Sequence, residues 1–267
     1  MFDETFAQAW RLRYGGEPSG NAPELARFLT HRSVREFSAE PVAEETVAAL
    51  VACAQSAATS SNLQLWSIVS VQERERRDRL ATLCANQQQI RDAAWFLAFC
   101  ADHHRLTRAA RALGEDPQAL QYLEFYTMAA IDASLAAERM TCAAESLGLG
   151  VCYIGALRTD PKGVAEALGL PDGVFGLFGY CLGRPRADAK ADVKPRLPQR
   201  AIWFRDQYGP DADLSEYDER MRPFYLSVGG DPAVTWSQRS ARRVTMPHLG
   251  GRAAQRAFLE SHGFGLK

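Results

Sequence analysis

The sequence MAAIDASLAA, residues 128–137, lies in the middle of a stretch from Pro117 to Leu147 that contains no glycine or proline after its first residue. Alanine, leucine, methionine and glutamate dominate the stretch, and their propensities predict a helix of about 30 residues. Its middle has few polar positions on any face. Because a helix that is apolar nearly all round is buried, we expect it either in a large core or between subunits.

Shorter elements are predicted on both sides of this helix. Apolar positions at helical spacing predict helices from Val47 to Ala57, Glu73 to Ala85 and Asp160 to Leu168. Short apolar runs predict sheet strands at residues 65–71, 95–101, 151–154 and 175–182. Such interleaving of helices and strands indicates an α/β or α+β fold with one central sheet.

The composition excludes several classes of protein. The 267 residues include 31 basic and 32 acidic side chains and are 46% hydrophobic. These values argue against a disordered chain and against polyanion binding, so no nucleic-acid partner is expected. The longest uncharged run, residues 46–72, has a polar centre that hydrocarbon would not accommodate, so no membrane span is expected. The N-terminus shows no secretory pattern, which makes the cytoplasm the predicted compartment.

Cysteine and histidine spacing gives no sign of a metal site. The six cysteines form no CxxC pair and no cluster at zinc spacing, and are expected to be reduced, structural thiols. Asp102-His103-His104 could ligate a metal, but adjacent histidines in a strand-to-helix connection point to different sides. A polar surface is therefore the favoured interpretation of this triplet.

The composition changes after Gly183. Residues 184–200 carry six basic and two acidic side chains and three prolines, which predicts an extended segment with a local charge of +4. Helices are expected beyond it at residues 214–226, 235–243 and 251–261. This tail is either an excursion over the core or an arm that embraces a second subunit. For the N-terminal residues, Met1 to about Pro23, the only prediction is a helix.

One polar stretch concentrates hydrogen-bond donors. In HRSVREF, residues 31–37, His31, Ser33 and Arg35 share one side if the segment is extended, which leaves Val34 and Phe37 for the core. A phosphate or a ring carbonyl would suit these donors, because arginine presents a fixed fork of N–H groups to such oxygens.

Two further stretches could serve the same ligand. Lys194 and Arg196 stand two residues apart in the proline-stiffened segment and could bring a second pair of cations to one anion. TSSNLQ, residues 59–64, is a polar turn between an apolar helix and an apolar strand, where donors can meet a flat heterocycle. No GxSxG, Walker, HExxH or strand-following GxGxxG motif is present.

In this order, HRSVREF, ATSSNLQ, ESLGLGVCYIGALR, GLFGYCLGRP, DVKPRLP and VTWSQRSARR resemble the flavin-dependent nitroreductase family, most of all its oxygen-insensitive, NADPH-preferring major type (group A). The resemblance runs from about Phe28 to the C-terminus. It implies an α+β sandwich: a central mixed, mostly antiparallel sheet flanked by helices. It also implies one domain, 24–267, with a C-terminal excursion, 184–267, in a homodimer with two FMN molecules at the interface. Residues 1–23 form an N-terminal extension that the resemblance does not cover.

The resemblance also implies which residues bind FMN. The ribityl phosphate would be held by His31, Arg32, Ser33, Lys194 and Arg196. Arg35 would lie near flavin N1 and the C2 carbonyl, where a cation stabilises the negative charge that two-electron reduction places on N1. Gln87 would face the pyrimidine edge, and the backbone N–H of Gly155 would reach N5. The remaining expected contacts are Ser60, Ser61 and Gln64, from the other subunit, and Tyr153, Ile154, Ala156 and Leu157.

The implied activity is that of an FMN-dependent NAD(P)H oxidoreductase. NADPH or NADH would reduce the flavin, which would then reduce nitroaromatics, quinones or free flavins in a two-electron, ping-pong hydride transfer. No catalytic side chain is expected, because the flavin performs the chemistry. A reductase that supplies reduced flavin to a partner would share all these residues.

The alternative is a flavin-storage or sensor protein with little turnover. In the NADPH-preferring relatives the segment corresponding to residues 226–233 carries arginines, whereas this chain has Val228 and Ala233 there. Arg239, Arg242 and Arg243 lie just downstream and could replace them. The retained Arg35 favours catalysis, since storage has no need of a cation at N1.

Overall fold

The predicted long helix is present as α7, Leu123–Ser146, in the computed structural model, which describes residues 5–267. Its predicted start at Pro117 is wrong. Gln118–Gln121 form a separate 3₁₀ turn, and Tyr122 is extended. The backbone groups at this junction pair with the C-terminal residue: Lys267 N donates to Gln121 O at 3.0 Å, and Leu123 N donates to Lys267 O at 3.2 Å. Neither α7 nor any other helix of residues 5–267 is long and apolar enough to cross a membrane.

The chain folds into two compact units, each made of two separate parts of the sequence. Unit 1 joins the N-terminal residues up to Ser33 to Lys190–Leu249, and unit 2 joins Val34–Ala189 to Gly250–Lys267. The sheet and α7 belong to unit 2.

Four strands form the sheet of unit 2 in the order β1-β2-β4-β3, and each pair is antiparallel. The strands are β1 (Trp66–Val71), β2 (Trp95–Asp102), β3 (Gly150–Ile154) and β4 (Val174–Gly183). The register shifts at a bulge between Phe99 and Cys100. An antiparallel sheet with helices packed on it confirms the predicted α+β class.

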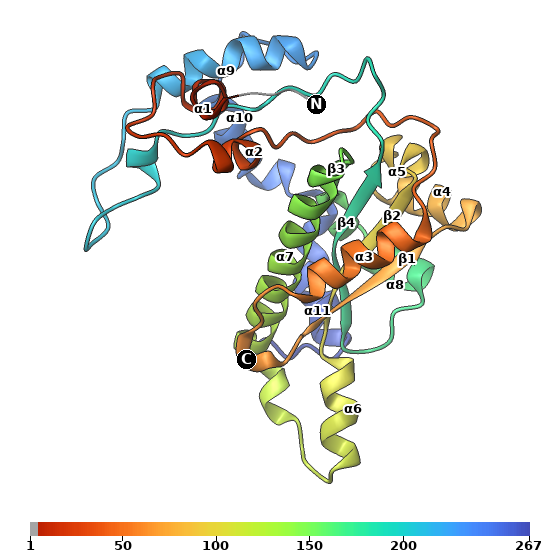
Figure 1. The fold of residues 1–267 in the computed structure, drawn as a ribbon. Helices are drawn as coiled ribbons and strands as arrows, with labels where there is room; N and C mark the ends of the chain where they lie inside the picture. Colours follow the sequence, from red (N-terminus) through yellow and green to blue (C-terminus); the bar gives the residue numbers. More distant parts are fainter. Residues whose placement is uncertain (1–4) are drawn as a thin grey trace. The chain divides into compact units, whose positions relative to one another are not determined.

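Helices cover both faces of this sheet (Figure 1). On one face, α3 (Glu44–Gln55) lies beside α7, and both contribute to a core that includes Phe99 and Tyr180. On the other face, α8 (Pro161–Leu168) packs against β4 and against α4 (Arg74–Leu83). The other helices of unit 2 are α5 (Gln89–Asp92), α6 (His104–Ala112) and α11 (Gln255–Ser261).

The last residues of the chain belong to the core of unit 2. Leu259 and Phe264 are buried in a cluster with Ala129, Ala133 and Phe175. The helix predicted from residue 251 begins only at Gln255, because Gly250–Ala254 form a 3₁₀ segment. The end of the predicted tail thus packs into this core.

Unit 1 contains the predicted N-terminal helix, α1 (Phe6–Tyr14). Thr5 caps it in a reciprocal box with Gln8, whose backbone N–H donates to Thr5 Oγ1 at 3.3 Å. Phe6 and Ala9 pack against Ala26 in a small core. The other helices of this unit are α2 (Ala26–Leu29), α9 (Ser215–Ser227) and α10 (Trp236–Arg243).

Substitution of Gly179 should test the packing at the centre of the sheet. A Cβ atom there would lie 2.5 Å from Phe96 Cζ and 3.1 Å from Ile154 Cβ. We expect Gly179→Ala to lower the free energy of unfolding by about 1–3 kcal/mol in urea titrations, because a filled core resists an added methyl group. Gly20→Ala is the matched control, since a Cβ there meets nothing within 4 Å. Equal stability of the two variants would contradict the described packing.

Candidate functional site

The polar turn before β1 has an unusual backbone. Ser61, Asn62 and Gln64 have φ values of 49°, 55° and 52°. These are left-handed conformations that residues other than glycine rarely adopt. Each costs on the order of 1–3 kcal/mol and persists only when the surrounding structure enforces it. Such strain is typical of ligand-binding loops, and here it falls on the turn that the sequence predicts to border a flavin.

A buried carboxylate on α7 holds this turn from beneath. Asp132, only 1% exposed, accepts hydrogen bonds from Thr59 Oγ1 at 2.6 Å, Ser60 N at 3.0 Å and Leu65 N at 3.2 Å. This role was not predicted from the sequence. The available signal was a single acidic residue in the apolar middle of the helix, residues 128–137, because a buried carboxylate must find partners.

Arg105 of α6 holds the other side of the turn. Its guanidinium donates to Gln64 O at 2.9 Å and forms an ion pair of 3.1 Å with Asp102. A groove of about 650 Å³ opens beside the turn. Its lining includes Asn62, Leu63, Gln64, Trp66 and Arg105. The size is within the range of about 300–1,000 Å³ that suits a small ligand.

Gln87 follows a second strained loop. Ala85 and Asn86 have φ values of 63° and 54°. The side-chain oxygen of the half-buried Gln87 accepts a hydrogen bond from Gln89 Nε2 at 2.6 Å. This loop precedes β2, whereas the turn at Ser60–Asn62 precedes β1.

The two loops lie at opposite ends of the sheet. In the antiparallel register Trp66, next to the turn, pairs with Ala101, whereas Val71 pairs with Phe96, near the start of β2. At about 3.3 Å per residue, the length of β2 separates the two ends by more than 20 Å. The structure therefore does not bring Ser60, Ser61 and Gln64 of one chain together with Gln87 of the same chain.

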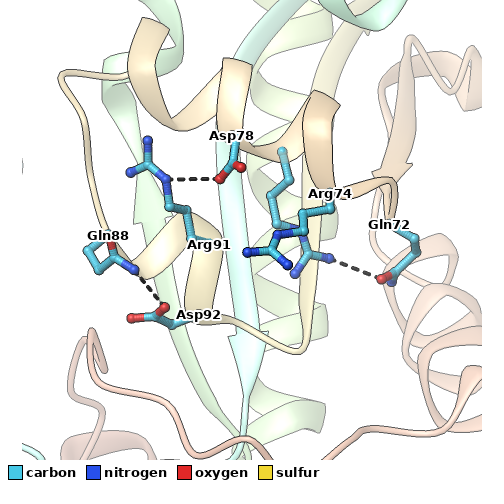
Figure 2. A pocket seen from close by; sticks show the side chains of 7 residues that line it. Gln72, Arg74, Asp78, Gln88, Arg91 and Asp92 are labelled. Carbon is cyan, nitrogen blue, oxygen red and sulfur yellow. Dashed lines mark hydrogen bonds and ion pairs between the residues drawn. The ribbon is translucent and has the colours of Figure 1, made fainter.

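A second hollow, of about 300 Å³, lies close to Gln87 between α4 and α5 (Figure 2). Four of its side chains pair with one another. Arg91 Nε lies 3.0 Å from Asp78 Oδ1, and Gln88 Nε2 donates to Asp92 Oδ1 at 2.8 Å. The residues that line this hollow are all polar or charged, so it offers no apolar wall to a flavin.

Arg35 is exposed beside the edge strand of the sheet. Val34 N donates to Val151 O at 2.9 Å, which pairs the segment with β3. Val34 and Phe37 are buried, as the predicted alternation requires. No carboxylate within residues 5–267 is paired with the Arg35 guanidinium, which leaves it available to a ligand.

The end of β3 leads into a 3₁₀ turn, Gly155–Arg158. Ile154, Ala156 and Leu157 are buried, whereas Gly155 is half-buried. The Tyr153 hydroxyl lies 2.9 Å from Thr141 Oγ1 of α7, and burial raises the pKa of this phenol. Because these side chains are occupied by the core, a ligand at this turn would meet backbone groups. Ala156 is not in a left-handed conformation.

The polar-surface interpretation of Asp102-His103-His104 is wrong. Asp102 and His103 are buried, and the His103 ring lies 4.5 Å from the ring of Phe264, which the C-terminal segment supplies. Burial lowers the pKa of His103, so its ring is neutral near pH 7. No group of three or more metal-binding side chains occurs in the described part of the chain.

The buried cysteines are poor nucleophiles. Burial raises the pKa of Cys84 and of Cys100 to about 12. Both thiols therefore stay protonated at neutral pH, and none of the six cysteines forms a disulfide.

The predicted phosphate-binding residues all belong to unit 1. The half-buried residues His31, Arg32 and Ser33 follow α2, and Lys194 and Arg196 lie in the extended segment. Arg13 of α1 connects the two segments, because its guanidinium donates to His31 O and to Lys194 O, each at 2.6 Å. The structure thus brings the two predicted cation pairs into one neighbourhood.

The segment after α9 lacks arginines at residues 228–233 but is held by two arginines from nearby. Arg222 donates to Pro232 O at 2.8 Å, and Arg239 donates to Asp231 O at 2.6 Å. Arg243 donates to His248 O at 2.8 Å. The third downstream arginine, Arg242, is exposed. Within the described chain its side chain donates no hydrogen bond to a backbone carbonyl.

Comparison with known proteins identifies the family. The model of the nitroreductase family matches residues 29–184, and the model of its C-terminal domain matches residues 194–267. The chain belongs to the nitroreductase family. This confirms the predicted family, and residues 1–28 precede the first match.

Relatives of this nitroreductase cover most of its length. It is 37% identical to an FMN reductase (NADPH) of Bacillus subtilis, over 80% of this chain and 88% of the relative. It is 38% identical to the oxygen-insensitive NADPH nitroreductase of Salmonella typhimurium, over 84% and 91%. The solved NADPH:FMN oxidoreductase of Vibrio harveyi, complexed with NAD+, superposes with a TM-score of 0.80 at 34% identity, over 91% and 99%.

Removal of the Asp132 carboxylate should release the strained turn. We expect Asp132→Ala to lower the free energy of unfolding by about 3 kcal/mol, because three donors lose their acceptor. Asp132→Asn keeps one acceptor oxygen and should cost about half as much. Ser134→Ala is the control on the same helix, since within residues 5–267 the Ser134 hydroxyl donates only to Ala130 O. Urea titration measures all three, and an Asp132→Ala variant as stable as the control would contradict the assigned role.

Proposed function

We propose that this nitroreductase is an FMN-dependent NAD(P)H oxidoreductase that transfers two electrons to nitroaromatics, quinones or free flavins. The observation that carries the proposal is the likeness, over most of the chain, to relatives named as NADPH-dependent FMN reductase and nitroreductase. The names of these relatives indicate turnover, which favours catalysis over storage of the flavin.

The cations of unit 1 fit the phosphate of FMN. His31, Arg32 and Ser33 supply donors from one segment, and Lys194 and Arg196 supply charge from the other. Arg196 is exposed, and Lys194 is half-buried with its Nζ 5.4 Å from the centroid of the Phe224 ring. Arginine and lysine bind phosphate through short, charge-assisted hydrogen bonds, which would account for retention of FMN rather than of a neutral flavin.

Other predicted residues would contact the flavin ring. The available guanidinium of Arg35 would stabilise negative charge at N1 and the C2 carbonyl, Gln87 would bond the pyrimidine edge, and the Gly155 N–H would meet N5. When bound, FMN supplies the chemistry, by accepting a hydride from the nicotinamide and passing two electrons to the acceptor. The protein orients the partners and stabilises charge. Protons for the product come from water.

A second copy of the chain would complete the site. Ser60, Ser61 and Gln64 lie at the opposite end of the sheet from Gln87, so they would border a flavin bound mainly by the other subunit. The long helix supports a homodimer, because its apolar residues Ile131 and Leu135 are 51% and 45% exposed. Burial between subunits, one of the two expectations for this helix, would cover them. The cytoplasm stays the predicted compartment.

The visible spectrum of the purified protein tests the proposed function. We expect a yellow protein that either nucleotide bleaches under anaerobic conditions. Because Val228 and Ala233 replace arginines that would meet the 2′-phosphate, NADPH should bleach it less than about tenfold faster than NADH. A colourless protein that takes up no added FMN would overturn the proposal. A yellow protein that neither nucleotide bleaches would favour the storage alternative.

Arg35→Ala should weaken FMN binding and slow reduction of the bound flavin by about a hundredfold, because the charge opposite N1 is lost. Stopped-flow absorbance measures the reduction rate. Arg79→Ala is the control, since Arg79 is exposed and pairs with Glu166 on the surface. Reduction of Arg35→Ala at the control's rate would remove Arg35 from the flavin.

A further inference from the structure

Arg13 lies at the end of α1 and is 4% exposed. Its guanidinium uses three N–H groups on three main-chain carbonyls. Nε donates to Leu29 O, Nη2 to His31 O and Nη1 to Lys194 O, each at 2.6 Å. One side chain thus fixes the end of α2 and both segments that carry the predicted phosphate ligands.

The main chain of Arg13 adds a second connection to the same segment. Arg196 N donates to Arg13 O at 2.9 Å. The Lys194–Arg196 segment is therefore bound to α1 on both sides of Pro195, whose carbonyl accepts a further bond from the buried Tyr217 hydroxyl at 3.3 Å. Three successive residues of an otherwise extended segment are held in place.

The end of α1 is itself well anchored. Gly15 ends the helix with φ 80°, and its N–H donates to Arg11 O at 2.8 Å. The Arg220 side chain packs so closely that a Cβ on Gly15 would lie 2.7 Å from its Cδ. With Phe6 and Ala9 packed in the small core, α1 can act as a fixed support for Arg13.

Bringing the two basic segments together has an electrostatic cost. Both segments are basic, with Arg32 on one and Lys194 and Arg196 on the other, and like charges brought close together repel one another. Hydrogen bonds from Arg13 to backbone carbonyls hold the segments without using the side chains that must bind the anion. Such preorganisation raises affinity, because the cost of assembling the site is met during folding rather than on binding.

We propose that Arg13 is a positioning residue for the phosphate of FMN, which holds the His31–Ser33 and Lys194–Arg196 segments in register for one anion. The inference rests on the proposed function, since it takes the anion to be the FMN phosphate. It assigns a role to the N-terminal extension, because Arg13 precedes the first residue that the family models match.

The test compares FMN with riboflavin, which lacks the phosphate. Dissociation constants are measured by flavin fluorescence quenching on the full-length apo-protein. We expect Arg13→Ala to raise the value for FMN by about tenfold or more and that for riboflavin by less than about twofold. A general loss of stability would weaken the binding of FMN and of riboflavin to the same extent. Arg11→Ala is the matched control, because Arg11 lies on the same helix but pairs with the exposed Glu17 at 2.8 Å.

Two further variants separate the possible failures. If Arg13→Ala does not fold, Arg13→Lys replaces it, since an ammonium keeps the charge but cannot reach three carbonyls in one plane; the same selective loss of FMN is expected. The double variant Lys194→Ala/Arg196→Ala should also lose FMN selectively. If it does and the Arg13 variants do not, the positioning role is overturned while the phosphate site stands. If the double variant binds FMN normally, the phosphate site itself is wrong.

Discussion

Small side chains on α7 let its backbone approach the sheet closely, and this contact determines the position of most other parts of unit 2. Ala136, Ala137 and Ala144 are fully buried in the same cluster as Phe99 and Tyr180. Close-packed interiors transmit displacements rather than absorb them. Because Asp132 stands on the same helix and bonds the strained turn, the packing of α7 also fixes the backbone of Thr59–Leu65.

Elements with a strong local signal could be predicted from the sequence. The continuous apolar run at residues 95–101 is found as β2, and the extension helix is found as α1. The predicted start of α7 at Pro117 was wrong, and the reason lies outside the local sequence. Helical propensity continues back to Pro117, but the backbone groups around Tyr122 pair with Lys267 instead of extending the helix.

The sequence predicts residues that would face a ligand, but it does not predict the residues that support them. Composition and motif order identify the polar turn and the basic segments, whereas nothing near Asp132 or Arg13 in the sequence names their partners. The Nη1 atom of Arg13 bonds a carbonyl 181 residues away. His103 was wrongly placed at the surface because the residue that covers it, Phe264, comes from the end of the chain.

The discontinuity of both units has a consequence for the order of synthesis. A ribosome completes the four strands of the sheet at Gly183, but Leu259 and Phe264, which fill one end of its core, emerge much later. The nascent sheet therefore carries an open apolar surface while residues 184–258 are being added. The Arg13 side chain likewise lacks the carbonyl that its Nη1 bonds until Lys194 has been synthesised. Neither unit can reach its final packing before the other has been largely translated, so the two should mature together near the end of translation.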